Sequence, residues 1–148
     1  MITVLTEIFE RDLNKLITEI NAYTNETNIW AIRPGISNSA GNLCLHLVGN
    51  LNHFIGATLD NNGYVRNRDA EFALKNIPRS ELVSSLEKTI AIVKAGLENQ
   101  TAASLQEIFP LEPFGKKMIT EFMLVHLTTH LSYHLGQINY HRRMIEGS

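Results

Sequence analysis

The sequence predicts an all-α protein, an antiparallel four-helix bundle that forms a single domain over residues 1–148. Three observations predict this fold. Four long segments repeat apolar residues at the 3–4 spacing of one helix face, no segment alternates apolar and polar residues as a strand does, and 148 residues is close to the commonest domain size. With 44% hydrophobic and 19% charged residues, the composition is that of a folded globular chain.

The first helix is expected over residues 3–23. Its apolar residues form one stripe, at Leu5, Ile8, Phe9, Leu13, Leu16, Ile17 and Ile20. A stripe of this kind buries one side of a helix against a core. The next stretch, residues 28–39, contains Pro34 and Gly35, and we expect it to form an ordered but irregular connection.

The second helix is expected over residues 40–59. Asn38 or Ser39 can cap its first turn, because short polar side chains accept hydrogen bonds from free backbone N–H groups there. The sequence Asp-Asn-Asn-Gly at residues 60–63 predicts the turn that ends it. The polar stretch that follows, to residue 79, is expected to be a loop.

The third helix is expected over residues 80–98, directly after Pro78, with an apolar stripe at Leu82, Leu86, Ile90, Val93 and Leu97. The fourth is expected over residues 118–145, since Gly147 is typical of the residue that follows a helix. Between them, residues 108–115 are rich in proline and aromatic residues. We expect this segment to be extended and to pack its aromatic rings over one end of the bundle.

Composition excludes several classes of partner. The chain has 13 Lys and Arg against 15 Asp and Glu, a formal net charge of -2. This balance predicts neither nucleic-acid binding nor attraction to an anionic membrane, and no run approaches the ~18 apolar residues of a spanning helix. The first residues lack the basic stretch of a secretory signal. Cys44 has no second cysteine to pair with, so a reducing, cytoplasmic compartment is expected.

Histidine is the unusual feature of the sequence. In the fourth helix, His126, His130 and His134 follow one another at spacings of four residues, and His141 comes seven residues later. These spacings place all four side chains along one ridge of the helix. Two histidines one turn apart can both reach a single metal ion through neutral ring nitrogens. Spacing alone allows either adjacent pair, His126 with His130 or His130 with His134.

The second helix supplies the expected third ligand. His46 lies among apolar residues and is expected to be buried, whereas His53 lies about 10 Å further along the helix and cannot share the same ion unless the helix bends. One histidine from this helix and two from the fourth give a site with three neutral nitrogen ligands. Such a set leaves at least one coordination position for water or substrate, as in catalytic metal sites.

Other chemistries find no support in the sequence. A single histidine in an apolar helix is most often a packed, hydrogen-bonded core residue. For His126 this packed role stays open beside a role at the metal site. The chain has no E-x-x-H or H-E-x-x-H motif, no C-x-x-C pair and no glycine-rich phosphate loop, which excludes carboxylate di-iron bundles, zinc proteases and structural zinc sites. Cys44 is expected to be a packed thiol rather than a nucleophile.

Two stretches of the chain resemble the DinB-like superfamily. They are NSAGNLCLHLVGNL, residues 38–51, and HLTTHLSYHLGQI, residues 126–138. The likeness extends over the four-helix pattern of essentially the whole chain and is nearest to a small, largely uncharacterised bacterial branch. It implies a DinB-like bundle in which His46, His130 and His134 bind a divalent metal, usually nickel, zinc or iron, with His126 one turn before the pair.

The same resemblance implies an activity and an assembly. Characterised members of the superfamily are S-transferases and isomerases that use low-molecular-weight thiols such as bacillithiol or mycothiol, and members commonly form homodimers. A metal-dependent thiol S-transferase acting on a small electrophile is therefore expected, with His126 as its catalytic residue. The alternative is a non-catalytic, stress-associated metal-binding bundle. Arg66, Arg68, Arg142 and Arg143 are either cations for a carboxylate-bearing thiol or solvated surface residues.

Overall fold

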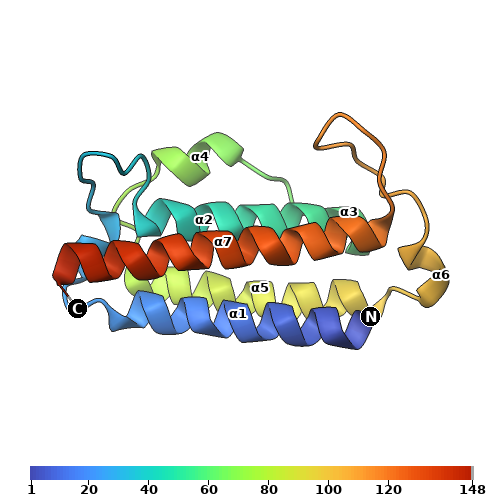
Figure 1. The fold of residues 1–148 in the computed structure, drawn as a ribbon, viewed down its shortest axis with the longest axis horizontal. Coiled ribbons are helices and arrows are strands. Elements are labelled where there is room, and N and C mark those ends of the chain that lie inside the picture. The colour runs from blue at the N-terminus through green and yellow to red at the C-terminus, as the bar shows by residue number, and fades with distance from the viewer. Residues whose placement is uncertain (148) are drawn as a thin grey trace.

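The computed structural model describes residues 1–147 and confirms the all-α bundle (Figure 1). Four helical columns pack together. They are α1 (Ile2–Ala22), α2 (Ala40–Leu51) with its continuation η2 (Asn52–Ala57) and α3 (Thr58–Asp60), α5 (Arg79–Glu98), and α7 (Thr120–Glu146). The short elements are η1 (Glu26–Trp30), α4 (Arg68–Ala73) and α6 (Ala102–Leu105). Within the described residues, β-type pairing is limited to one isolated bridge.

The helices run in two directions, as Figure 1 shows: α1 and α7 run one way, and α2 and α5 run the other. The neighbours α1 and α5 are therefore antiparallel, as are α2 and α7. The parallel arrangement of α2 and α5 requires the chain to return along the bundle between them. Residues 61–78, which we call the crossover, make this return and carry α4 across the outside of α2.

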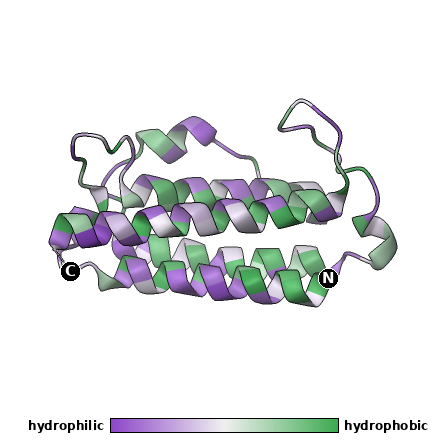
Figure 2. Ribbon diagram, in the orientation of Figure 1, coloured by the Kyte–Doolittle hydropathy of each residue, from purple (hydrophilic) through white to green (hydrophobic). Residues whose placement is uncertain are grey.

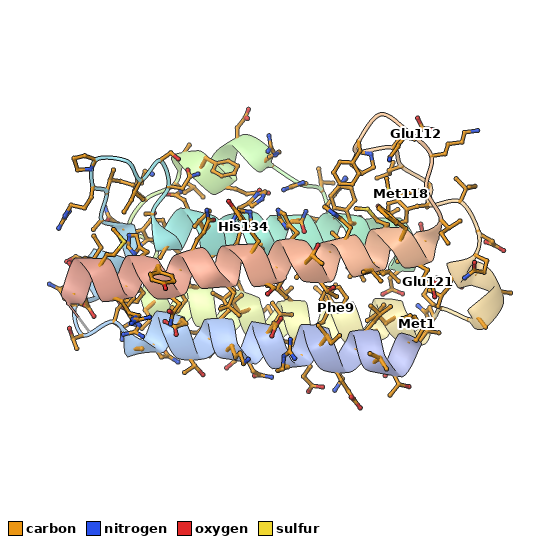
Figure 3. The ribbon with its side chains drawn as sticks, in the orientation of Figure 1. Met1, Phe9, Glu112, Met118, Glu121 and His134 are labelled. Carbon is orange, nitrogen blue, oxygen red and sulfur yellow. The ribbon has the colours of Figure 1, made fainter. Side chains whose placement is uncertain are left out.

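The core forms where the predicted stripes meet. In α1 the buried apolar residues are Leu5, Phe9, Leu13, Leu16 and Ile20, each at most 2% exposed. Each long helix carries both hydrophobic and hydrophilic residues along its length (Figure 2). Phe9 points from α1 into the bundle (Figure 3). None of the described helices is both long enough and apolar enough to cross a membrane.

The second helix begins as predicted, but it is not regular throughout. Ser39 is its N-cap, and the Ser39 side chain accepts a hydrogen bond from the Asn42 backbone N–H at 3.1 Å. After Leu51 the helix widens into the π-helical stretch η2. Single π turns inside helices occur frequently at functional sites. Cys44 lies in the core of this helix, where burial raises the pKa of its thiol to about 12, so the packed-thiol prediction is confirmed.

Two connecting segments contain short helices that periodicity did not predict. The expected loop at residues 60–79 contains α4, whose N-cap Asn67 accepts a hydrogen bond from the Ala70 N–H. Six residues are too few to show a helical repeat. In the segment after α5, the helix α6 begins with a capping box. Further along this segment, Phe109 packs on Phe54 with ring centroids 6.2 Å apart. Of the aromatic rings expected to pack over this end of the bundle, the ring of Phe109 does so.

Candidate metal centre

Helices α2 and α7 bring His46, His130 and His134 together. One ring nitrogen from each lies within 4.8 Å of the other two. The closest approach joins Nε2 of His46 and Nε2 of His130, which are 3.2 Å apart. His46 is buried and the other two are half-buried. Figure 3 shows His134 on the edge of α7 that lies toward α2 and α4.

Local helix geometry explains this convergence. His130 and His134 are one turn apart on α7, so their rings meet edge to face, with centroids 4.6 Å apart and planes at 86°. His46 on the facing helix inserts edge-on beside both, at centroid distances of 5.1 and 5.2 Å. The predicted pairing of one histidine from the second helix with two from the fourth is therefore present in the fold.

The second nitrogen of His46 is held by a carboxylate. Nδ1 of His46 lies 3.0 Å from Oε1 of Glu71, a residue of α4 that is only 6% exposed. Because an ionised carboxylate can only accept hydrogen bonds, Nδ1 carries the hydrogen and donates it. The lone pair of His46 is then on Nε2, which faces the cluster. Arg66 donates to both oxygens of Glu71, from Nε at 2.8 Å and from Nη2 at 2.9 Å.

The second nitrogen of His134 is held by an amide. Gln137, three residues further along α7, accepts a hydrogen bond on Oε1 from Nδ1 of His134 at 2.7 Å. The amide oxygen is an acceptor only, so this contact also leaves the lone pair of the ring on Nε2. Two of the three histidines thus present an unprotonated Nε2 through hydrogen bonds made on their far side, which is the usual support of a metal-binding histidine.

His130 has no such partner. Its Nδ1 atom is buried without a hydrogen bond, and burial, followed by the neighbouring His134 and His46, lowers the pKa of His130 to about 4. Burial also lowers the pKa of His46, and this effect outweighs that of Glu71, which raises it. Both rings are therefore neutral near pH 7. Neutral imidazole is the form that binds metal.

The three histidines fit a divalent transition metal ion. Three borderline nitrogen donors suit zinc, nickel or iron better than magnesium or calcium, which prefer oxygen. The Nε2 atoms of His46 and His130 face each other at 3.2 Å, so a proton or a cation must lie between their lone pairs. Zinc–nitrogen bonds of about 2.0–2.1 Å can be made from positions this close after small ring movements.

His126 lies outside the cluster. Its ring centroid is 6.3 Å from that of His130, one turn further along α7, and 4.6 Å from that of Phe114 in the loop before α7. The ring is half-buried. It therefore borders the cluster without belonging to it. Of the two pairs that spacing allowed, the pair His130 and His134 is the one that joins His46.

The remaining histidines have other surroundings. His53 is in η2, and its ring packs on Phe54 with centroids 4.8 Å apart. His141 was expected on the histidine ridge, but its ring is buried at the far end of α7 and takes no part in the cluster. Its Nε2 donates to the Ala31 carbonyl at 2.8 Å, and its Nδ1 accepts from the Tyr23 hydroxyl at 2.6 Å. α7 continues past the first residue of α2, and there its neighbours are α1 and the segment that follows α1.

Sequence reasoning missed Glu71 as a site residue and gave Arg66 a different role. The histidine ridge itself carries no carboxylate, but the crossover supplies one from outside the ridge. The expectation that Arg66 is either solvated or available to a carboxylate-bearing thiol is wrong. Its side chain is 12% exposed and is paired with Glu71. Only the cap Asn67 and the apolar Phe72 marked this stretch as more than a loop.

A pocket of about 380 Å³ borders the cluster at His134. Its walls are the segment Gly35–Asn38, which precedes α2, and the side chains of Tyr133, Gln137 and Tyr140 on α7. A volume of this size is in the range of small-molecule sites. The rings of Tyr133 and Tyr140 and the amide of Gln137 offer surfaces for an uncharged organic group.

Fold and site together define a helical bundle with a three-histidine cluster between two of its helices. The chain belongs to the family described as protein of unknown function (DUF1572), whose model matches residues 3–148. This family is placed in the DinB/YfiT-like clan, which agrees with the resemblance found in the two histidine-containing stretches. No curated protein matches the chain.

Proposed function

We propose that this protein binds one divalent transition metal ion through His46, His130 and His134. The observation that carries the proposal is the orientation of the rings. Glu71 and Gln137 accept hydrogen bonds from the outer nitrogens of His46 and His134, so both rings offer a lone pair toward the cluster. Nickel, zinc and iron are the metals this donor set favours.

Three neutral ligands leave room for a fourth. In such sites the open position takes water or substrate, and the cation lowers the pKa of a thiol or water that binds there. We therefore propose an enzyme rather than a purely structural site. Support comes from the pocket beside His134 and from the kinship with the DinB/YfiT-like clan.

The reaction we propose is thiol S-transfer to a small electrophile. The thiol loses its proton to His126, which is one turn from the ligand pair and able to act as a base. The sulfur electron pair then forms a C–S bond with the electrophilic carbon, and the leaving group departs with the bonding electrons. His126 returns its proton to the leaving group or to water. Gln137 and the pocket would hold the organic part of one substrate.

A second function follows from where the cluster lies. Because its ligands come from α2 and α7, a bound ion would join two helices that are far apart in sequence. An ion that binds the native state but not the unfolded chain stabilises the fold. A non-catalytic, stress-associated metal-binding protein, in which the ion serves stability, is therefore the alternative.

One experiment separates these functions. The protein is purified without a histidine tag, its metal content is measured by mass spectrometry, and the loaded protein is assayed with a panel of thiols and a chromogenic electrophile. Stoichiometric metal with thiol-dependent turnover supports the enzyme. Stoichiometric metal that raises the melting temperature without turnover supports the alternative. A protein that takes up none of zinc, nickel or iron contradicts both.

We also propose that the partner of this chain is a second copy of itself. The outward side of α7 carries exposed apolar residues at the 3–4 spacing of one face, namely Phe122, Val125, Tyr133, Tyr140 and Met144, which are 41% to 65% exposed. We call this face the α7 stripe. The intervening positions of the stripe, Thr129 and Gly136, are uncharged. An apolar stripe of this length on a helix surface marks an interaction site.

A further inference from the structure

The crossover is fastened to one side of α2 at three successive positions. Asn42, His46 and Gly49 are separated by four and three residues and so lie along one stripe of the helix. Asn42 Nδ2 donates to the backbone carbonyls of Glu71 at 2.9 Å and Leu74 at 2.8 Å. These two bonds fix the position of the last turn of α4 over α2.

Gly49 provides the space for the Glu71 carboxylate. A Cβ atom at position 49 would collide with the carboxylate oxygen Oε2. The absence of a side chain therefore lets the carboxylate lie against the backbone of α2. Of these three positions, Asn42 binds the backbone of Glu71, and His46 is the one whose side chain contacts its carboxylate.

The ring of His46 is also fixed from its other side. Phe72, the neighbour of Glu71 on α4, packs against it with centroids 5.1 Å apart. Arg66 pairs with both carboxylate oxygens and limits rotation of the carboxylate. Nη2 of Arg66, a donor, also lies 3.4 Å from Nδ1, but the carboxylate oxygen is closer, at 3.0 Å. This acceptor favours the tautomer of His46 with the hydrogen on Nδ1 and the lone pair on Nε2.

We propose that Glu71 is a positioning residue of the metal centre: it selects the Nδ1–H tautomer of His46 and so presents Nε2 to the ion. Arg66, in turn, holds the carboxylate in the orientation that does this. The proposal rests on the metal-binding function proposed above, but the tautomer itself exists in the metal-free protein. The crossover thus acts on the metal without contributing a ligand to it.

Glu71→Gln gives the sharpest test, because the amide has the shape of the carboxylate but different hydrogen-bonding atoms. Arg66 donates to both oxygens of Glu71, but the amide keeps only one oxygen. We expect this oxygen to stay on Nε of Arg66, the shorter of the two bonds at 2.8 Å, so the amide NH₂ takes the place of Oε1 and faces Nδ1 of His46. The NH₂ group can only donate. His46 is then expected to accept on Nδ1 and to carry its hydrogen on Nε2, where it blocks metal binding.

The tautomer is read by ¹⁵N–¹H NMR of metal-free protein, and affinity by competition with a zinc-binding dye. In the wild type we expect the Nδ1–H form of His46. In Glu71→Gln we expect the Nε2–H form and a zinc Kd weaker by about 10- to 100-fold. Gly49→Ala, which displaces the carboxylate while retaining the acid, is expected to weaken zinc binding as well.

Asp69→Asn is the matched control, since it makes the same change of charge on α4 at an exposed position. It is expected to leave both tautomer and Kd unchanged. An Nε2–H tautomer in the wild type, or a Glu71→Gln protein with unchanged tautomer and Kd, overturns the proposal. If the wild type binds no zinc, the metal-binding function fails, whereas the NMR result still decides the role of Glu71.

Discussion

Nε2 of His46 lies 3.2 Å from Nε2 of His130, although 84 residues separate the two in sequence. Because Glu71 leaves a lone pair on Nε2 of His46, neutral His130 donates its Nε2 hydrogen to that lone pair in the metal-free protein. A bound cation would replace this hydrogen, and both rings could then offer lone pairs to it. The metal should therefore depend on His130 as much as on His46.

His130→Ala is expected to lower metal occupancy by at least about tenfold, as loss of a direct ligand should. Occupancy is measured by mass spectrometry after dialysis against a fixed concentration of free zinc. His53→Ala, which removes a half-buried histidine outside the cluster, is the control and should retain the metal. Equal occupancy in the wild type and His130→Ala would show that His130 is not a ligand.

The lowered pKa values of His46 and His130 predict that the metal is retained in mild acid. A histidine with its ordinary pKa of about 6.5 would lose the ion as the pH falls through about 6 to 5. Because the metal-free pKa of His130 is about 4, protons compete with the ion for this ring only at lower pH. We expect little release between about pH 7.5 and 6, and full release only as the pH approaches 4.

This prediction is checked by measuring bound zinc across a pH series, with circular dichroism to follow folding. Release that precedes any loss of helix is the expected order. Half-release near pH 6.5 would contradict the lowering of the pKa values of His46 and His130 by burial.

The four long helices and the histidine ridge follow from local sequence pattern, whereas the choice of His130 with His134 came from the resemblance to the DinB-like superfamily. Periodicity places the histidines on particular helix faces, and bundle packing then brings α2 against α7. Glu71 could not be found in this way. Its position depends on how the crossover lies on α2, which is set by the bonds of Asn42 to the backbone of α4. His141 shows a different limit of sequence reasoning. It lies on the predicted ridge of α7, but its ring contacts Tyr23 and not the cluster.

The C-terminal end of α7 is fastened to the segment after α1 by Glu146. Its carboxylate accepts hydrogen bonds from the Thr24 N–H and hydroxyl, the Asn25 N–H and the Asn28 side chain, at 2.9 to 3.1 Å. Desolvation raises the pKa of Glu146, but the bonds from Asn28, Thr24 and Asn25 outweigh it and lower the pKa to about 2. The folded protein therefore favours the ionised form.

This pKa sets the pH dependence of stability. A carboxyl whose folded pKa is below its unfolded pKa of about 4.3 stabilises the protein above that pH, and the contribution is lost as the pH falls toward 2. Glu146→Gln is expected to lower the melting temperature at neutral pH. The difference in melting temperature between this variant and the wild type should become smaller as the pH falls below about 4. Glu87→Gln, an exposed change on α5, is the control. An unchanged melting temperature for Glu146→Gln would contradict this role.

The α7 stripe predicts a dimer of this chain. Sedimentation or light scattering should give twice the chain mass at micromolar concentration. Val125→Lys combined with Tyr140→Lys places two charges within the stripe and is expected to yield a monomer, since burying unpaired charges is unfavourable. Ile108→Lys, which changes an apolar residue that is 55% exposed outside the stripe, should remain dimeric. A monomeric wild type contradicts the proposed partner.

The last prediction concerns the division of roles along α7. His126 and His134 are eight residues apart, about 12 Å along the axis, so both cannot bind the same ion. In the structure His134 joins the cluster, whereas the ring of His126 lies beside Phe114 at its border. If His126 is the base of the proposed thiol transfer, it acts on the substrate and leaves the metal in place.

His126→Ala should therefore retain most of the metal and lose most of the thiol-transferase activity, by about 10²- to 10⁴-fold if it removes a general base. His134→Ala should lose both. Metal content and turnover are measured on the same preparations, with zinc added back in excess to the His134→Ala protein. If His126→Ala loses the metal while His134→Ala keeps it, the ligand pair is His126 and His130, and the alignment with the DinB-like pattern is one turn too late.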